Sequence, residues 1–424
     1  MKLAILKELR PDETRVAASP ETVKKFVDLG LTVVVEKGAG ALAAISDQGF
    51  KDAGATIAAN AGAALKGADV VLKVSRPMIA GEKKDELNAF SKGQTLVCHM
   101  NALSEPNFVA AMAKAGVNGF AMELMPRITR AQSMDILSSQ SNLAGYKAVL
   151  DAAGHYGRAF PMMMTAAGTV PPARAFIMGV GVAGLQAIAT AKRLGAIVTA
   201  TDVRPATKEQ VESLGGTFIA VEDEEFEQAQ TAGGYAKEMS AAYKKKQATL
   251  IADHIAKQDI VICTALIPGR PAPQLISETM VKSMKPGSVV VDLAVEAGGN
   301  CAGAKFGQVV EKNGVTIVGY ANVPGRVAEE ASKLFSRNLF NFLSPYFDKE
   351  AKSFAFDPED EIIQGTMITK GGGVIHPSLK KKPATQKKAP AKKATAKKAP
   401  SKAAASKKAG SKPAKRKTPK KKGA

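Results

Sequence analysis

The chain has 424 residues, and its 59 Lys and Arg against 39 Asp and Glu give a formal net charge of +20 at neutral pH. Residues 377–424 contain 18 Lys, one Arg and no acidic residue, so residues 1–376 keep 40 basic and 39 acidic residues, a net charge of +1. No apolar run reaches the ~20 residues of a membrane-spanning helix, the N-terminus becomes charged too early for a signal peptide, and the three cysteines are scattered. The composition therefore argues against an integral membrane protein, a secreted disulfide-rich protein and a zinc module.

Short apolar runs alternate with helical patterns along the first third of the chain. Strands are predicted at residues 3–6, 32–36, 70–74 and 95–97. The first helix is expected to begin at Pro20, because Ser19 can cap it and proline is favoured at the first helical position. Strands that alternate with helices predict βαβ units and a parallel sheet.

The middle third repeats this alternation more clearly. Strands are predicted at 175–178, 197–201, 217–220, 260–263, 289–292 and 316–318, with helices such as 183–194 and 273–284 between them. Six strands in this rhythm predict a second doubly wound α/β sheet. Residues 328–346 read as one long helix that returns the chain to the first domain. We therefore expect a discontinuous Rossmann-like domain of residues 1–140 and 328–376, and a second Rossmann-like domain of residues 141–327.

Residues 377–424 have the composition of a tail. A Lys-Lys-Ala motif recurs every five residues from Lys387, and no aromatic or large aliphatic residue follows Leu379. A segment with nothing to bury is expected to stay disordered. Its charge favours contact with anionic lipid, an acidic partner or nucleic acid, and a merely solvated extension is the remaining alternative.

A glycine-rich turn carries the clearest functional signal. The predicted strand 175–178 runs into Gly179-Val-Gly181-Val-Ala-Gly184, which opens a helix, and Asp202 ends the next strand. In this pattern the first glycine permits a tight turn, the second lets backbone amides approach a pyrophosphate, and the third lets the helix pack on the strand. Asp202 can accept hydrogen bonds from a ribose 2′-hydroxyl, which favours NAD over NADP, although Arg204 weakens that preference. A plain tight turn is the structural alternative.

A second motif precedes this turn. Residues 125–146 read MPRITRAQSMDILSSQSNLAGY, and this stretch resembles the signature of the NAD(H)-binding domain I of proton-translocating nicotinamide nucleotide transhydrogenase. Residues 12–20 and 291–301 extend the resemblance, which covers residues 5–368. The wider superfamily includes alanine dehydrogenase.

The resemblance implies a set of nucleotide-binding residues. The catalytic residues, which position the nicotinamide, are Arg127, Gln132, Asp135 and Ser138. The cofactor-binding residues are Gly179, Val180, Gly181, Val182 and Gly184 at the pyrophosphate turn, Asp202 and Val203 at the adenosine ribose, Gly234 and Tyr235 in a closing loop, Thr264, Ala265 and Leu266 along the crevice, and also Ile128, Thr129 and Arg204. From the residues alone, a surface ion pair between Arg127 and Asp135 is the competing interpretation.

The implied activity is hydride exchange between NAD(H) bound to this chain and NADP(H) bound to a partner subunit, coupled to proton movement through a membrane subunit. The resemblance also implies a homodimer. It implies a cytoplasmic location, with the protein peripheral on the inner face of the bacterial membrane. One alternative is alanine dehydrogenase, whose keto-acid site Arg15, Lys73 and His99 match, although Glu296 stands where that enzyme normally has Asp. The other is a nucleic-acid-binding protein that acts through its tail.

Overall fold

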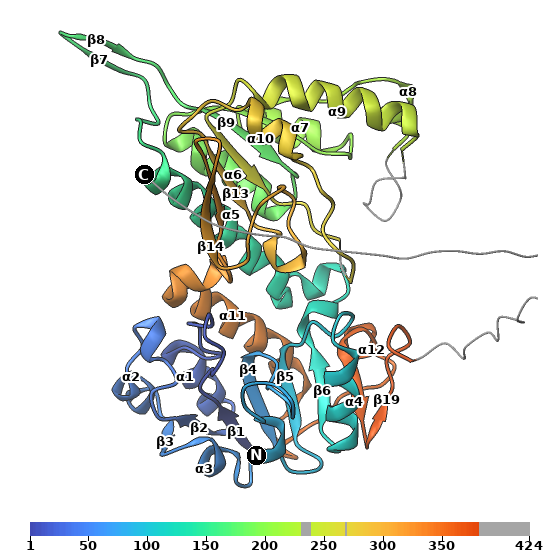
Figure 1. The fold of residues 1–424 in the computed structure, drawn as a ribbon. Helices are drawn as coiled ribbons and strands as arrows, with labels where there is room; N and C mark the ends of the chain where they lie inside the picture. The colour runs from blue at the N-terminus through green and yellow to red at the C-terminus, as the bar shows by residue number, and fades with distance from the viewer. Residues whose placement is uncertain (230–238, 268, 381–424) are drawn as a thin grey trace, which may run out of the picture. The chain divides into compact units, whose positions relative to one another are not determined.

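Two predominantly parallel sheets form the α/β fold of this chain (Figure 1). We describe it from a computed structural model, which places residues 1–229, 239–267 and 269–380. Residues 1–380 form one compact unit, and its last residues make a turn in which Leu379 packs on the core. Among the described residues, no helix is long and apolar enough to cross a membrane.

The first sheet has eight strands in the order β19-β18-β6-β5-β4-β1-β2-β3. Its strands are β1 (Lys2–Ile5), β2 (Thr32–Glu36), β3 (Thr56–Ala58), β4 (Val70–Ser75), β5 (Thr95–His99), β6 (Asn118–Ala121), β18 (Met367–Lys370) and β19 (Gly373–Val374). Strands β1 to β6 pair in parallel, whereas β18 is antiparallel to β6 and β19 to β18. All four strands predicted in this region are confirmed within two residues. The others escaped prediction because each has at most four residues and two of them contain glycine.

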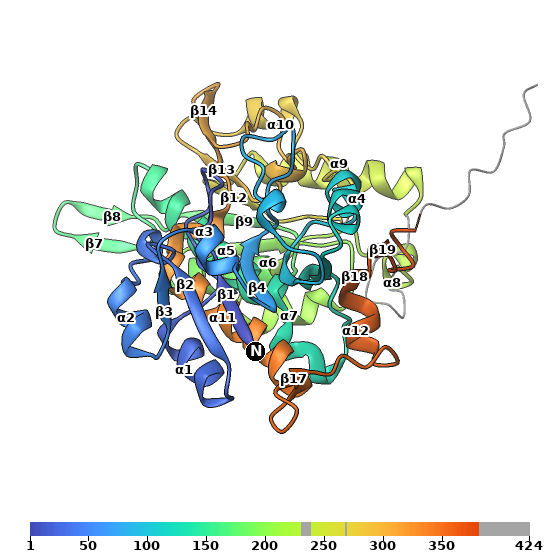
Figure 2. The same ribbon diagram turned by 90° about the horizontal axis from the view of Figure 1, so that it is seen from below.

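Helices cover both faces of this sheet, as Figure 2 shows. They are α1 (Pro20–Asp28), α2 (Asp47–Asp52), α3 (Ala61–Leu65), α4 (Pro106–Lys114), α11 (Ala328–Leu343) and α12 (Glu361–Thr366). Successive side chains of a strand point to opposite faces. Leu3 and Ile5 accordingly join one core cluster, with Phe335 of α11, while Ala4 joins the other, with Phe108 of α4.

The second sheet has seven strands in the order β11-β10-β9-β12-β13-β15-β14. Its strands are β9 (Arg174–Met178), β10 (Ile197–Thr201), β11 (Thr217–Phe218), β12 (Ile260–Cys263), β13 (Val289–Asp292), β14 (Gln308–Lys312) and β15 (Val315–Gly319); its helices are α5 (Ile136–His155), α6 (Val182–Arg193), α7 (Thr207–Ser213), α8 (Glu224–Glu227), α9 (Ala241–Ile255) and α10 (Glu278–Ser283). Only β14 pairs antiparallel. The strand order reverses at β9, and ligands of such sheets bind beyond the carboxyl ends of the strands at this point.

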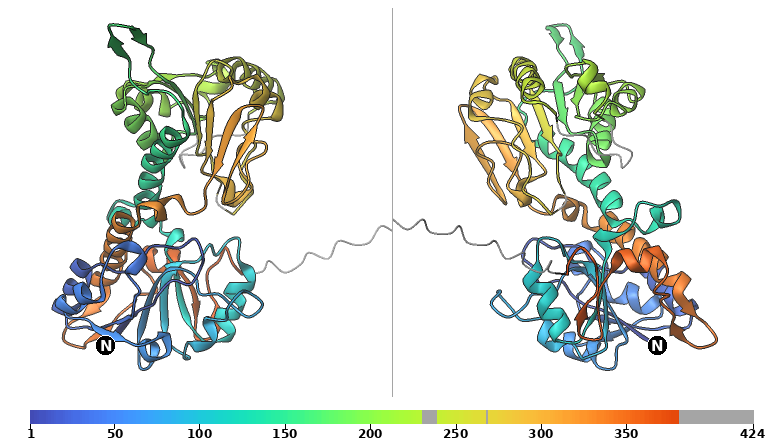
Figure 3. Two further views of the ribbon diagram at one scale, coloured as in Figure 1. Left: turned by 60° about the vertical axis from the view of Figure 1, so that its left-hand side comes forward. Right: turned by 90° about the vertical axis from the view of Figure 1, so that its right-hand side faces the viewer.

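Two local predictions need correction, and one hairpin was not predicted. The helix predicted at 273–284 begins only at Glu278, because the Ser277 side chain caps it by accepting a hydrogen bond from the Met280 amide, 3.2 Å away. The long helix ends at Leu343, where Pro345 enters a 3₁₀ turn. A hairpin of β7 (Met163–Thr165) and β8 (Gly168–Val170), not predicted, projects near the second sheet (Figure 3).

Candidate nucleotide-binding site

The turn between β9 and α6 leaves little room for side chains at two of its three glycines. Gly179 has a φ of +100°, and a Cβ there would lie 2.6 Å from the Thr264 hydroxyl. A Cβ on Gly184 would lie 1.9 Å from the carbonyl oxygen of Gly179, so only glycine lets α6 start this close to the strand. At Gly181 a Cβ would meet nothing within 4 Å. The open space at Gly181, beside the start of a twelve-residue helix, suits a pyrophosphate group.

Asp202 lies beside this turn, at the end of β10. Its carboxylate accepts hydrogen bonds from the Val180 amide at 2.7 Å and from the Arg204 side chain at 2.8 and 2.9 Å. Arg204 also donates to the Val180 carbonyl at 3.1 Å. The hydrogen bonds to Asp202 raise the pKa of the Arg204 guanidinium. The structure thus joins the turn, the acidic residue and Arg204 in one network.

The next strand end, after β12, forms the other side of this crevice. Thr264 donates from its hydroxyl to the Gly179 carbonyl at 2.9 Å. Ala265 is held by the buried side chain of Asn300, which accepts from the Ala265 amide at 3.1 Å and donates to the Ala265 carbonyl at 2.9 Å. The same amide nitrogen of Asn300 donates to the Pro273 carbonyl at 2.7 Å.

Asp292, at the end of β13, supports Asn300 in turn. Its carboxylate is fully buried and accepts from the backbone amides of Ala294, Asn300 and Cys301 at 2.7 to 2.9 Å. Burial raises the pKa of this carboxyl, although the three hydrogen bonds act in the opposite direction. Sequence reasoning did not single out Asp292 or Asn300, although polar residues directly after a buried strand are a usable signal.

Apolar side chains around the turn remain exposed. Val182, Val203 and Leu266 are 39, 53 and 56 % exposed. All three were implied to contact the nucleotide, and an apolar ring could cover them. Gly234 and Tyr235, implied in the closing loop, lie outside the described residues.

The predicted nicotinamide segment forms a 3₁₀ turn, Thr129–Met134, followed by α5. Asp135 caps α5 by accepting from the amide and the hydroxyl of Ser138, at 3.0 and 2.5 Å. Ile128 is half-buried, whereas Arg127, Thr129 and Gln132 are exposed.

Helix α11 and Asp360 hold this segment in place. Asn338 of α11 donates to the Ser133 carbonyl at 2.8 Å. Arg130 forms a bidentate ion pair with Asp360 at 2.5 and 2.9 Å, and the Tyr346 hydroxyl donates to the same carboxylate at 3.0 Å. Arg130 therefore has a structural role, because its ion pair with Asp360 holds this segment.

The keto-acid residues of the alternative interpretation lie in a different cluster, at the first sheet. Lys73 is fully buried and forms ion pairs with Glu8 and Glu86, both at 3.1 Å. Burial by itself would lower the pKa of Lys73, but the charges of Glu8 and Glu86 outweigh it and raise that pKa. The side chain of Lys73 therefore does not reach the surface.

Arg15 is likewise buried and paired with a carboxylate. Its guanidinium pairs with Glu13 at 2.7 Å and donates to the Gln140 side chain at 2.8 Å. Three carboxylates, those of Glu8, Glu13 and Glu86, thus surround two cations. Burial, with the nearby charge of Glu13, raises the pKa of Glu8. His99 is half-buried at the end of β5, and its carbonyl accepts from the Arg76 amide at 2.9 Å.

Comparison with known proteins places this chain among nicotinamide-nucleotide enzymes. Models of the C-terminal and N-terminal domains of alanine dehydrogenase/PNT match residues 148–377 and 4–144. The first part of the NAD(P) transhydrogenase subunit alpha of Rhodospirillum rubrum is 61 % identical over 89 % of this chain and 99 % of its own. The crystal structure of transhydrogenase from Sinorhizobium meliloti superposes with a TM-score of 0.80 at 55 % identity, over 88 % of this chain and 100 % of that one. Alanine dehydrogenase of Bacillus subtilis is 30 % identical over 77 % of this chain and 80 % of its own.

Proposed function

Because the chain belongs to the alanine dehydrogenase/PNT family, and within it to the transhydrogenase alpha-subunit group, we propose that it binds NAD(H) and exchanges hydride with NADP(H) held by a partner subunit. The observation that carries this proposal is the β9–α6 turn, where Gly181 faces open space and Asp202 stands at the next strand end. The bound nicotinamide supplies the hydride chemistry. The protein has only to position it, at a donor–acceptor distance of ~3–3.5 Å.

Each group of residues has a positioning role in this proposal. The turn at Gly179–Gly184 holds the pyrophosphate, and Asp202 accepts hydrogen bonds from the adenosine ribose. Arg127, Gln132, Asp135 and Ser138 orient the nicotinamide carboxamide. Since Asp135 already binds the Ser138 hydroxyl, these two side chains act as one unit. Asn300 supports the crevice indirectly, by holding Ala265.

An alanine dehydrogenase activity is disfavoured by the state of its would-be substrate residues. A keto-acid carboxylate could reach Lys73 only by displacing Glu8 or Glu86 from a buried ion pair. It would likewise compete with Glu13 for Arg15. Displacing buried, paired carboxylates costs several kcal/mol, which a small substrate cannot easily offset.

The proposal includes further subunits. A membrane subunit would couple hydride transfer to proton movement, and an NADP(H)-binding subunit would supply the second nucleotide. This chain would then lie in the cytoplasm, on the inner face of the bacterial membrane. Its basic tail, of which residues 381–424 lie outside the described residues, would contact anionic lipid, an acidic partner or nucleic acid electrostatically. Deleting residues 381–424 should remove that contact without changing NADH affinity.

A homodimer is also proposed, and the β7–β8 hairpin supports it. Met162, Met163 and Met164 are 61, 43 and 79 % exposed on this projecting hairpin. Exposed, flexible apolar side chains of this kind favour a protein contact. Met164→Lys should shift the mass measured by light scattering from dimer to monomer, and an unchanged mass would exclude the hairpin as the interface.

The decisive experiment separates binding from catalysis. Purified full-length chain should bind NADH in a calorimetric titration. It should not catalyse NADPH-dependent reduction of an NAD analogue until the membrane and NADP(H)-binding subunits are added. Rapid transfer by the isolated chain, or amination of pyruvate with NADH, would overturn the proposal.

A further inference from the structure

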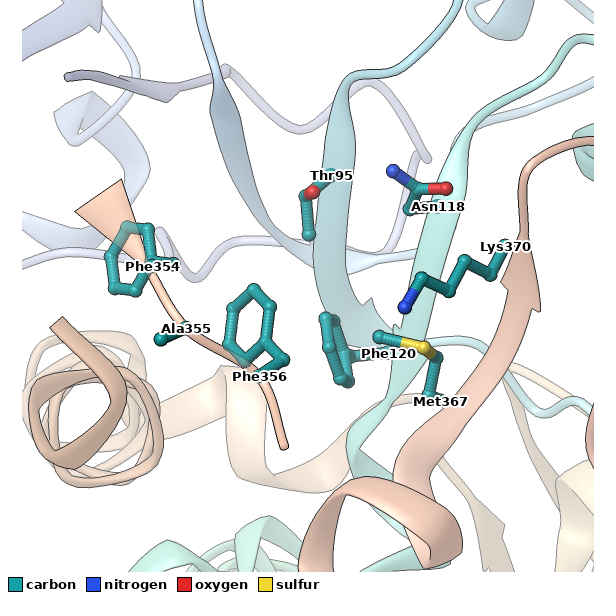
Figure 4. A pocket seen from close by; sticks show the side chains of 8 residues that line it. All are labelled: Thr95, Asn118, Phe120, Phe354, Ala355, Phe356, Met367 and Lys370. Carbon is teal, nitrogen blue, oxygen red and sulfur yellow. The ribbon is translucent and has the colours of Figure 1, made fainter. Parts of the chain in front are cut away.

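A cavity of about 360 Å³ lies on the α11 face of the first sheet, at the starts of β5 and β6 (Figure 4). Thr95 and Asn118, the first residues of these strands, line it. The charged cluster around Lys73 and Arg15 and the glycine turn contribute no residue to this lining. The cavity is thus separate from both sites described above, and its volume is within the range of small-molecule pockets.

Aromatic rings form a preformed wall of this cavity. Phe354 and Phe356 stack in parallel with ring centroids 5.5 Å apart. The ring of Phe356 packs at a tilt on that of Phe120 of β6, with centroids 4.7 Å apart. The Ala355 amide between them donates to the Tyr346 carbonyl at 2.8 Å, which fixes this segment against the end of α11. Met367 of β18 lies beside the rings. Such a wall favours a flat, apolar ligand body, since aromatic rings and sulfur both pack well on aromatic faces.

The polar side chains that line the cavity differ in whether they have hydrogen-bond or ion-pair partners. Asn118 is occupied, because it donates to the Gly93 carbonyl at 3.2 Å and accepts from the Gly371 amide at 3.1 Å. Within residues 1–229, 239–267 and 269–380, by contrast, neither the Thr95 hydroxyl nor the Lys370 ammonium has a hydrogen-bond or ion-pair partner. No acidic side chain lines the cavity. The lining therefore offers one unpaired cation and one hydroxyl beside an aromatic wall.

We propose that this cavity binds a small aromatic carboxylate, with its ring against the half-buried Phe354 and Phe356 and its carboxylate on Lys370 and Thr95. A carboxylate matches an ammonium and a hydroxyl donor, and its charge-assisted hydrogen bonds are the strong ones. A dinucleotide does not fit, because the cavity has a single cation and no glycine-rich turn for a pyrophosphate. The inference is independent of the function proposed for the glycine turn.

The test is a calorimetric titration of the full-length protein with 1-naphthoate in ~0.3 M salt, which screens weak association with the basic tail. Saturable binding of one equivalent is expected, and saturating NADH should leave it unchanged. Lys370→Gln should weaken this binding about tenfold, since a charge-assisted hydrogen bond is lost. The neutral 1-naphthamide should bind the unaltered protein about tenfold less tightly than naphthoate.

Lys114→Gln is the matched control, because Lys114 is also exposed and lies outside the cavity lining. It should bind naphthoate like the unaltered protein. A second variant, Phe356→Leu, tests the ring wall and should also weaken binding, with the thermal unfolding midpoint reporting whether the fold is kept. Absence of saturable binding, displacement by NADH, or equal affinity of the Lys370→Gln protein would overturn the proposal.

Discussion

The two sheets of this protein use the residues at their strand ends in opposite ways. At the first sheet, Lys73 and Arg15 are buried and paired with glutamates. At the second, Asp202 pairs with Arg204, but the adjoining turn leaves open space at Gly181. Both sheets have a doubly wound design, and at the second the open space at Gly181 adjoins the start of α6.

This difference illustrates how two sheets of the same design can differ in which charges they pair and where they leave space, so that a site has to be argued from its own residues and not from the fold. Lys73 lies where a parallel sheet commonly binds ligands, but its charge is already neutralised by the chain itself. Gly181 carries no reactive group at all, and in the proposed function it matters because a Cβ there would meet nothing within 4 Å, which leaves space for a pyrophosphate. The predictions below test this contrast, from the largest expected effect to the smallest.

Removing the buried cation should have the largest effect, on stability. Lys73→Met leaves Glu8 and Glu86 buried without a counter-charge, so the free energy of unfolding in urea should fall by about 3–5 kcal/mol. NADH affinity should change less than about twofold at temperatures where the variant is folded. Lys114→Met, at an exposed position, should stay within about 0.5 kcal/mol of the parent. A small loss for Lys73→Met would mean that the first cluster is not structural.

Filling the glycine turn should abolish nucleotide binding. In Gly184→Val, the Cβ would meet the Gly179 carbonyl at 1.9 Å, so α6 must move away from the strand. NADH affinity in calorimetry should fall by about 100-fold or more. Gly181→Ala is the informative counterpart, because its Cβ enters open space: stability should be kept while NADH binds about tenfold more weakly. Unchanged NADH affinity in both variants would refute the site.

Neutralising the acidic strand end should change nucleotide preference. Asp202→Asn loses charge-assisted hydrogen bonds to the ribose hydroxyls, so NADH affinity should fall about tenfold. The affinity for NADPH should fall less or rise, because the like charge facing a 2′-phosphate is gone. The ratio of the two dissociation constants measures this effect. Arg204→Ala, which keeps the carboxylate, should not raise NADPH affinity.

The ion pair at the nicotinamide segment should have the smallest effect. Arg130 and the other groups around Asp360 hold the pKa of its carboxyl at about 2, below its ordinary 3.8. The lowered pKa means that the pair stabilises the fold fully above pH 3.8 and is lost as the pH falls through about 2. Because Arg130 is half-exposed, Asp360→Asn should cost less than about 1 kcal/mol at neutral pH. Unfolding measured from pH 6 downward should show the two proteins converging, and a gap that persists to about pH 2 would contradict the assignment.

Much of the fold follows from local sequence signals. The runs at 32–36, 197–201, 260–263 and 289–292 form strands with the predicted bounds, because β-branched residues buried on both faces have few alternatives. Ser19 caps α1 as predicted. The helix predicted from residue 273 begins only at Glu278. The prediction followed the helical spacing of the apolar residues and overlooked Ser277 as the cap.

The sequence by itself determined the two sheets' main strands, the glycine turn and its terminal acid, because each depends on neighbours along the chain. Only the tertiary structure decided that Lys73 is neutralised by Glu8 and Glu86, that Asn300 holds Ala265, and that Lys370 meets an aromatic wall. These pairings join segments far apart in sequence. Whether a charge is paired or available is therefore a property of packing, which no local pattern encodes.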